Sequence, residues 1–408
     1  MTVLIKKLLL LTIILTIILC SCGKENDNNK DNRQPSEAPQ QEDIDPLKGQ
    51  IDNMTLDEKI GQMVIVGLDG YEIDELTQDM IKQYKVGGFI LFKRNIKDAY
   101  QTLTFINSLK EANKENKIPL FVAADEEGGS VSRMPDEFIK LPTSRAIGKI
   151  DSEDLAFEIG NIIGQQLKSL GFNMNFAPVL DIDSNPNNPV IGNRSFGPNE
   201  DMVSRLGIAA MNGIQSHVIS TVKHFPGHGD TSVDSHIGLP MVNHDIDRLN
   251  NFELVPFAKA IKEGTDGVMI AHILLPAIDE VYPATLSKKV ISDILRAEMK
   301  FDGIVITDDM TMGAITENYD IGDAAVKSVL AGTDIVLVCH GYENQMKVIE
   351  SLKLAVSNDI ITEETLNDHV YRVLKLKQKY KLNDENIETV DIEGINRKIN
   401  ELLTKYMN

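Results

Sequence analysis

The stretch Gly303-Ile-Val-Ile-Thr-Asp-Asp309 shows the pattern that decides the fold: a short apolar run followed at once by carboxylates. Seven further apolar runs recur along the chain, over 63–67, 88–92, 120–124, 174–180, 218–222, 267–271 and 335–338. Continuous apolar strands that alternate with amphipathic helices are typical of a parallel sheet covered by helices. Eight such units predict a single (β/α)8 TIM barrel of the α/β class, and an open doubly wound sheet is the alternative.

Helical patterns lie between and around these runs. Between them, apolar residues recur at helical spacing over 98–115, 154–170, 202–217, 288–300 and 321–330. After the eighth run, we predict a helix over 363–380 that closes the domain and another over 395–406 on its outside. Before the first run, Thr55-Leu-Asp-Glu58 resembles a capping box at a helix start. We therefore expect the folded part to start near Ile51.

Charged or titratable side chains follow six of the eight runs. They are Asp125, Asp181, Lys223 with His224, His272, Asp308 with Asp309, and His340. Any one of the acids could be the N-cap of the following helix. In a barrel, however, the carboxyl ends of all strands meet on one face, where active sites lie. The pattern therefore predicts an active site on that face.

The N-terminus has the pattern of an export signal. Lys6 and Lys7 precede the apolar stretch 8–19, which is short for a membrane span and ends at Leu19-Cys-Ser-Cys22. This resembles a lipoprotein signal peptide over 1–21, with Cys22 as the lipidated first residue of the mature chain. We thus expect a protein anchored by lipid to the extracytoplasmic face of the cell membrane. An ordinary signal peptide or an uncleaved anchor is the alternative.

Composition divides the rest of the chain. Residues 22–48 are rich in Asn, Asp, Gln, Glu, Pro and Ser, and we expect a disordered polar tether because such a segment cannot bury a core. Residues 49–384 make up the predicted barrel. Residues 385–408 make up a C-terminal helical extension, and we expect no second large domain.

Charge and cysteine content limit the partners. The formal net charge of -20 repels phosphate backbones, so nucleic acid is not an expected partner. After removal of the signal only Cys22 and Cys339 remain, and Cys339 lies in an apolar run. We therefore expect Cys339 to be a buried free thiol and predict no disulfide. The oligomeric state stays open.

The loop after the fifth run, Lys223-His-Phe-Pro-Gly-His-Gly-Asp-Thr-Ser-Val-Asp-Ser-His236, concentrates catalytic residue types. Its proline and glycines exclude a regular helix or strand through its middle. Glycoside cleavage needs one group that protonates the leaving oxygen and another that attacks the anomeric carbon or activates water. His236, with Asp234 two residues before it, is the candidate acid/base. Asp308 and Asp309 are the candidate nucleophiles, and we expect only one of them to face the pocket.

The same loop could instead be a metal site. His224, His228, Asp230 and His236 are metal-ligand types. Against this alternative, Pro226 and Gly227 break any helix that would place His224 and His228 on one face, and the loop contains no His-Glu-x-x-His motif. We therefore expect no metal.

Several separate motifs resemble one family. Lys223-His-Phe-Pro-Gly-His-Gly-Asp230 with Asp234-Ser-His236 closely resembles the β-N-acetylhexosaminidase branch of the family 3 glycoside hydrolases. Five further motifs match in the expected order: Leu56-Asp-Glu-Lys-Ile-Gly-Gln-Met63, Asp125-Glu-Glu-Gly-Gly129, Asn175-Phe-Ala-Pro-Val-Leu-Asp-Ile182, Asn188-Pro-Val-Ile-Gly-Asn-Arg-Ser-Phe-Gly197 and Ile306-Thr-Asp-Asp-Met310. The resemblance covers residues 51 to 382.

The resemblance implies a retaining exo-β-N-acetylglucosaminidase that needs no cofactor. It implies Asp308 as the nucleophile, His236 as the acid/base and Asp234 as the partner of His236. It also implies a set of residues that hold the sugar, namely Asp125, Arg133, Arg194, Lys223 and His224. An alternative for Arg133 is a surface ion pair.

The resemblance and the expected envelope location together suggest peptidoglycan fragments such as GlcNAc–MurNAc as the carbohydrate substrate. Phosphate could replace water as the acceptor, because a histidine acid/base carries no negative charge. Glu126 and Ser130 depart from the family pattern, where Gln and Arg are common, which puts the leaving-group preference in doubt. The alternatives are a β-glucosidase or xylosidase of the same family, or a lipoprotein that binds sugars without cleaving them.

Overall fold

The computed structural model describes residues 45–236 and 238–407. The expected signal peptide, nearly all of the expected tether and the expected lipidation site Cys22 lie outside these residues. Among the helices that the structure describes, none has the length and apolarity needed to cross a membrane.

Eight parallel strands form one closed sheet. Their order around the sheet is β7-β6-β5-β4-β3-β2-β1-β8, and β1 pairs with both β2 and β8. A parallel bridge between Ile306 and Ile335 joins β7 to β8 and completes the ring. The strands are β1 (Val64–Gly67), β2 (Gly88–Ile90), β3 (Phe121–Ala124), β4 (Met174–Asn175), β5 (Ile219–Phe225), β6 (Gly267–Ile270), β7 (Ile304–Thr307) and β8 (Val336–Val338). The predicted (β/α)8 barrel is confirmed, and the open doubly wound sheet is excluded.

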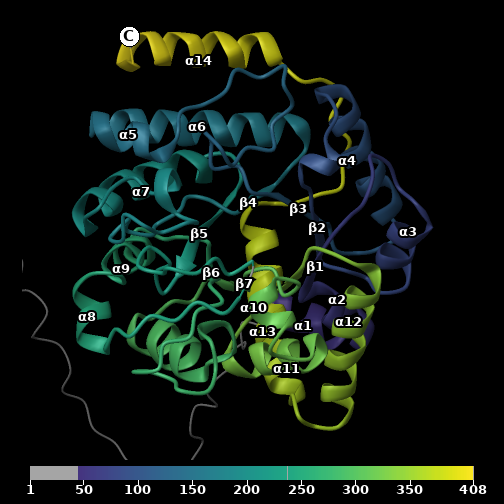
Figure 1. Ribbon diagram of the computed structural model, residues 1–408. Helices are drawn as coiled ribbons and strands as arrows, with labels where there is room; N and C mark the ends of the chain where they lie inside the picture. Colours follow the sequence, from purple (N-terminus) through teal and green to yellow (C-terminus); the bar gives the residue numbers. More distant parts are fainter. Residues whose placement is uncertain (1–44, 237, 408) are drawn as a thin grey trace, which may run out of the picture. The chain divides into compact units, whose positions relative to one another are not determined.

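Helices surround the strands (Figure 1). Those that alternate with the strands are α3 (Glu75–Lys82), α4 (Ala99–Asn113), α6 (Glu153–Leu170), α7 (Glu200–Gln215), α9 (Val255–Lys262), a π-helical segment (Lys289–Glu298), α11 (Ile321–Ala331) and α12 (Tyr342–Ser357). The shorter α5 (Ser144–Ile150), α8 (Ile246–Asn251) and α10 (Gly313–Thr316) lie within loops that follow β3, β5 and β7. Capping side chains fix several helix starts, because Asp98, Ser152 and Asn199 each accept a hydrogen bond from a first-turn N–H.

Successive side chains of each strand point alternately into the barrel and toward the helices, so the core has an inner and an outer layer. On β1, Ile65 points into the barrel interior, whereas Val64 and Val66 pack with the surrounding helices. The interior layer includes Phe121, Met174 and similar buried side chains from the other strands. The helix α13 (Glu363–Lys379) adds Val373 and Leu376 to this layer. It therefore belongs to the barrel rather than to a separate extension.

The first helix that the structure describes is α1 (Pro46–Asp52), so folded structure is already present before the start expected near Ile51. The side chain of Asp45 caps this helix by accepting a 3.0 Å hydrogen bond from the Leu47 N–H, and Pro46 occupies its first turn. Leu47 and Ile51 are buried. These two apolar side chains anchor a segment whose polar composition had suggested tether up to residue 48.

The capping box before α2 (Leu56–Gln62) is present, with Thr55 and Glu58 bonded to each other's backbone N–H groups at 2.8 and 3.2 Å.

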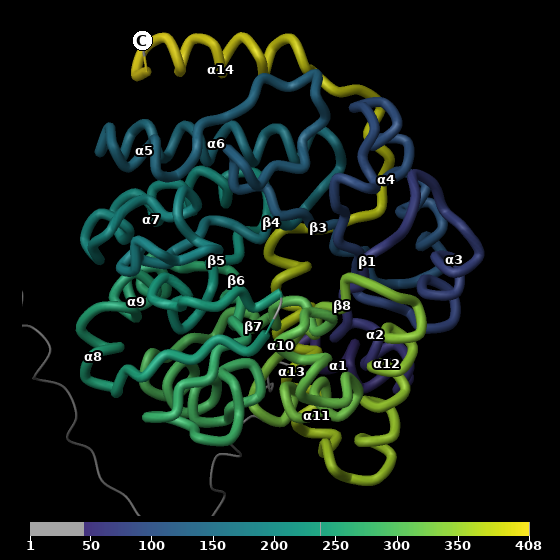
Figure 2. The backbone as a smooth tube through the Cα atoms, viewed as in Figure 1, coloured from purple at the N-terminus to yellow at the C-terminus, as the bar shows by residue number. Residues whose placement is uncertain are grey.

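At the C-terminal end, the chain leaves α13, passes α4 and reaches α14 (Ile392–Met407) beside α6 (Figure 2). The Asn396 side chain fixes α14 there, with hydrogen bonds of 2.9 and 2.8 Å to the backbone of Ile139 and Glu137. The predicted outer helix is thus confirmed.

Candidate active site

A cavity of about 230 Å³ opens at the carboxyl ends of the strands. Its wall includes residues that follow β2, β3, β5, β7 and β8, together with residues of the loop after β4. Seven of the predicted site residues line it: Asp125, Arg133, Arg194, Lys223, His224, His236 and Asp308. The eighth, Asp234, contacts His236 from the same loop.

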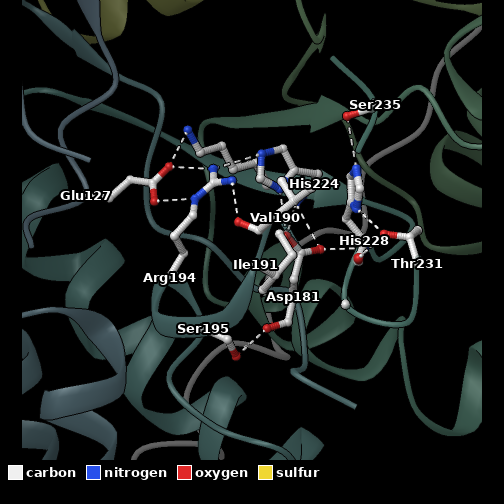
Figure 3. Close-up of polar contacts among 12 residues, drawn as sticks. Glu127, Asp181, Val190, Ile191, Arg194, Ser195, His224, His228, Thr231 and Ser235 are labelled. Atoms are coloured by element: carbon white, nitrogen blue, oxygen red, sulfur yellow. Dashed lines mark hydrogen bonds and ion pairs between the residues drawn. The ribbon is translucent and has the colours of Figure 1, made fainter. Parts of the chain in front are cut away.

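A buried cluster of ion pairs forms one side of the cavity. The Lys223 ammonium lies 2.7 Å from the Asp125 carboxylate and 2.8 Å from that of Glu127. Arg194 reaches the same Glu127 with two parallel hydrogen bonds of 2.9 and 2.8 Å (Figure 3). Burial alone would raise the pKa of Glu127, but Lys223 and Arg194 together hold it well below its usual value. Glu127 is therefore an ionised bridge between two cations that line the cavity.

Asp181, in the loop after β4, holds two histidines in place. Its side chain is fully buried and lies 2.6 Å from His224 Nδ1, and it accepts a 2.6 Å hydrogen bond from the His228 backbone N–H. The His224 ring then presents Nε2 toward Arg194, 3.3 Å away (Figure 3). The orientation of His224 in the cavity is thus set by a residue beneath it.

Asp308 follows β7 and lines the cavity. Its Oδ1 accepts a 2.8 Å hydrogen bond from the Asp309 backbone N–H. Burial would raise the pKa of Asp308, but His224, His272, the Asp309 N–H and Lys223 lower it below the usual value. An ionised carboxylate at this place can act as a nucleophile.

Asp309 also lines the cavity, so the expectation that only one of the two aspartates faces it is wrong. Their partners distinguish them. The Asp309 carboxylate accepts hydrogen bonds from the Thr311 N–H, the Thr311 hydroxyl and the Cys339 N–H at 2.9, 2.6 and 2.9 Å. Asp309 thus ties two loops together and Asp308 is the freer carboxylate.

His236 and Asp234 lie on the loop between β5 and α8. The imidazole Nδ1 is 2.7 Å from Asp234 Oδ1, which also accepts a 2.9 Å hydrogen bond from the His236 N–H. The His236 side chain is 65% exposed, so its Nε2 can reach a bound molecule. Hydrogen bonds from His236 lower the pKa of Asp234 against the opposing effect of its partial burial. The arrangement is suited to proton transfer.

Arg133 lies inside the cavity, not on an outer surface. Its guanidinium is 3.7 Å from the Asp125 carboxylate and 5.6 Å from the centre of the Phe92 ring. The Phe92 ring in turn stacks on His340, with 5.6 Å between ring centres. Cys339 is buried beside this group as a free thiol, as predicted. Burial raises its pKa well above the usual value, which disfavours the thiolate.

The polar side chains of the histidine-rich loop are hydrogen-bonded to one another and to neighbouring residues. Asp230 pairs with His244 at 2.8 Å, and His228 bonds to two hydroxyl groups. Over 45–236 and 238–407, no group of three or more His, Cys, Asp or Glu side chains is arranged to hold a metal ion.

Glu127, Asp181, His228 and Ser235 were not among the predicted site residues, although each supports or lines the cavity. A signal existed for two of them. Asp181 was noted as a charged residue after a strand, and Glu127 stands two residues after Asp125 in a similar place. Nothing in their residue types indicated that they would bridge other site residues.

A closed parallel barrel whose carboxyl-end cavity holds an ionised carboxylate and an Asp–His pair contains the groups that glycoside hydrolysis needs. The profile of the glycosyl hydrolase family 3 N terminal domain matches residues 55–376. The chain belongs to this family.

Two similar proteins are both named as hexosaminidases. A Beta-hexosaminidase A from Pseudoalteromonas piscicida is 37% identical over 326 residues, which are 74% of this chain and 54% of that protein. A Beta-hexosaminidase from Nitrosomonas eutropha is 33% identical over 297 residues, which are 71% of this chain and 84% of that protein. The chain therefore matches just over half the length of the first relative and most of the second.

A solved structure agrees with them. It is a glycoside hydrolase family 3 beta-N-acetylglucosaminidase from Paenibacillus sp. str. FPU-7, 41% identical, with a TM-score of 0.82. The match covers 86% of this chain and 69% of that one.

Proposed function

We propose that this protein is a retaining exo-β-N-acetylglucosaminidase that works through a covalent glycosyl-enzyme. The observation that carries the proposal is that one cavity is lined by both Asp308, from the end of β7, and His236, from the loop after β5. The names of the relatives, Beta-hexosaminidase and beta-N-acetylglucosaminidase, support the choice of sugar.

The proposed reaction has two steps, formation of the glycosyl-enzyme and its hydrolysis. In the first, an Asp308 oxygen attacks C1 while protonated His236 gives its Nε2 proton to the leaving oxygen, so the glycosidic bond breaks and an ester forms. In the second, a water oxygen attacks C1, neutral His236 takes the water proton, and the Asp308 carboxylate leaves. Asp234 holds Nδ1, which leaves Nε2 for both transfers.

The charged cluster beside Asp308 suits the hydroxyl groups of a terminal sugar. We assign this role to Asp125, Arg133, Arg194, Lys223 and His224. Carboxylates accept hydrogen bonds from hydroxyl groups, whereas guanidinium and ammonium groups donate to their oxygens. Lys223 and Arg194 already meet the shared Glu127, so their donors are pre-oriented and lose little conformational freedom when sugar binds.

We further propose that the aglycone is a peptidoglycan fragment and that the protein is lipid-anchored through Cys22 outside the cytoplasm. The lipoprotein-like sequence around Cys22 and the name of the solved relative, a beta-N-acetylglucosaminidase, support this. An enzyme anchored outside the cytoplasm would meet GlcNAc in the glycan of the cell wall.

The test compares nitrophenyl glycosides with the full-length protein. We expect release from the β-N-acetylglucosaminide to exceed release from the β-glucoside and β-xyloside, and Asp308→Asn to abolish it. Asp302→Asn, an exposed aspartate two residues before β7, is the matched control and should keep activity. Faster release from the glucoside, or equal rates for Asp308→Asn and the wild type, would overturn the proposal.

The natural substrate is tested separately on purified muropeptides, with and without phosphate. Free GlcNAc in both conditions supports hydrolysis of peptidoglycan fragments. GlcNAc 1-phosphate in the presence of phosphate would show that phosphate is the acceptor, and no product would refute the peptidoglycan assignment.

A further inference from the structure

Only one side chain in the tip of the acid/base loop, over 232–236, is buried. Ser235 is 2% exposed, whereas its neighbours Asp234 and His236 are partly or largely exposed. Two hydrogen bonds hold Ser235: its hydroxyl lies 3.1 Å from His228 Nε2, and its carbonyl accepts a 3.2 Å hydrogen bond from the Ala314 N–H. Ser235 is thus the contact between this tip and the barrel.

The other partner, His228, is itself fixed. It is 1% exposed, and its backbone N–H donates to Asp181 at 2.6 Å. Its carbonyl accepts a 2.8 Å hydrogen bond from the Asn188 amide, and its Nδ1 lies 2.8 Å from the Thr231 hydroxyl. Figure 3 shows His228 with Thr231 on one side of the ring and Ser235 on the other.

The hydrogen-bond directions can be assigned. The Thr231 hydroxyl is placed to donate to the His228 carbonyl, 3.0 Å away, so its oxygen accepts from Nδ1–H. Burial lowers the pKa of His228, which favours the neutral ring. Nε2 then has a free lone pair, and the Ser235 hydroxyl donates to it.

Resting on the function proposed above, we propose that the Ser235–His228 hydrogen bond is a latch that positions the His236–Asp234 pair over the cavity. Ser235 stands between the two residues in the chain, so fixing it limits where both can lie. His228 and Ser235 both line the cavity, and their role in this proposal is to position the acid/base pair through their hydrogen bond to each other. Through Asp181 the latch shares a support with the sugar-binding His224.

The latch should matter only when the leaving group needs a proton. A dinitrophenolate leaves without protonation, whereas a sugar alkoxide requires the acid. For Ser235→Ala we expect kcat/KM to fall roughly 10- to 100-fold on a GlcNAc-β-linked disaccharide but to stay within about twofold on the dinitrophenyl β-N-acetylglucosaminide. Ser232→Ala, an exposed serine of the same loop, should leave both rates unchanged.

Two substitutions of His228 separate the latch from packing. The amide of Gln reaches the place of Nε2 and can accept from Ser235, whereas the amide of Asn reaches only the place of Nδ1. We expect His228→Asn to behave like Ser235→Ala and His228→Gln to recover most of the disaccharide activity. Both variants keep the backbone hydrogen bond to Asp181.

The paired substrates make the outcomes distinct. A selective loss on the disaccharide supports the latch. Equal losses on both substrates in Ser235→Ala, or no loss on either, would overturn it. A wild-type protein inactive on both substrates would instead refute the proposed function.

Discussion

The imidazole Nδ1 of His236 lies 2.7 Å from Oδ1 of Asp234, two residues earlier on the same loop. A carboxylate bonded to one ring nitrogen fixes the tautomer and stabilises the charged ring. Because the pKa of Asp234 is held below its usual value by His236, Asp234 stays ionised in neutral and mildly acidic solution. The pair can therefore work as one acid/base unit.

Replacing Asp234 by Asn should weaken this unit without removing the imidazole. We expect kcat/KM on substrates with a sugar leaving group to fall by about 10²-fold, with an altered pH profile, because the amide cannot stabilise the imidazolium. Steady-state kinetics across pH 4 to 9 would check this. Unchanged kinetics would remove Asp234 from the mechanism.

Glu127 should be needed for both stability and sugar binding. Its side chain is 3% exposed, and Glu127→Gln leaves Arg194 with no carboxylate and Lys223 with only Asp125. We expect unfolding free energy to fall by about 3 kcal/mol at neutral pH and KM to rise. The matched control Glu350→Gln removes an exposed pair with Lys353 and should change stability by less than about 0.5 kcal/mol.

The effect of Glu127→Gln should also depend on pH. The pKa of Glu127 is lowered in the folded state. Its contribution to the free energy of unfolding is therefore fully present above the unfolded pKa near 4.5 and decreases as the pH falls below that value. Denaturant unfolding at pH 7 and pH 3 should show the difference between wild type and variant shrinking. A difference that stays the same at both values would contradict the assignment.

The pKa of Glu126 is shifted in the opposite direction from that of Glu127, so its effect on stability changes with pH in the opposite sense. Burial raises its pKa from 4.5 to about 7, although the Ser132 hydroxyl and the Arg133 N–H donate to it at 2.8 and 2.6 Å. The folded state therefore holds an extra proton between these pH values, and that stabilisation is lost as pH rises through 7. Glu126→Gln cannot titrate. Relative to the variant, we expect the wild type to lose on the order of 3 kcal/mol between pH 4.5 and 7.5.

Unfolding curves of both proteins at several pH values measure this difference directly. All other titrating groups are common to the two proteins, so their contributions cancel. A difference in unfolding free energy that does not change with pH would show that folding does not raise the pKa of Glu126.

Lys377 should contribute strongly to stability, because it joins segments at the amino ends of the barrel strands. It is buried on α13, and its ammonium donates to Gln62 Oε1 and to the carbonyls of Gly87 and Pro119 at 2.7, 2.9 and 2.6 Å. Lys377→Met would leave these acceptors without a donor, and we expect a loss of about 3 kcal/mol. Lys375→Met, on the same helix but exposed, should have little effect in thermal unfolding. A Lys377→Met protein as stable as the wild type would contradict this role.

The barrel could be predicted from the sequence because most of its strands lie within continuous apolar runs. Seven of the eight runs contain a whole strand, including 63–67, whose apolar residues overlap the opening helix pattern. The exception is β5, which continues past its run through Lys223 and His224 to Phe225. The start at Pro46 could not be predicted, because Leu47 is one apolar residue among polar ones. Its burial depends on tertiary packing that local composition does not show.

The candidate site could also be predicted only in part. Residues with direct chemistry, such as Asp308 and His236, could be placed by motif and by position after strands. Residues that act through others could not. His228 has the residue type of a metal ligand, and only the geometry reveals its contacts with Thr231 and Ser235.

The central claim is that Asp308 becomes covalently bonded to C1 of the sugar. A 5-fluoro β-N-acetylglucosaminyl fluoride should trap this ester, since its leaving group departs readily and the ring fluorine slows hydrolysis. We expect intact-protein mass spectrometry to show one added sugar and peptide mapping to place it on Asp308. Label on another residue, or equal labelling of Asp308→Asn, would contradict the account.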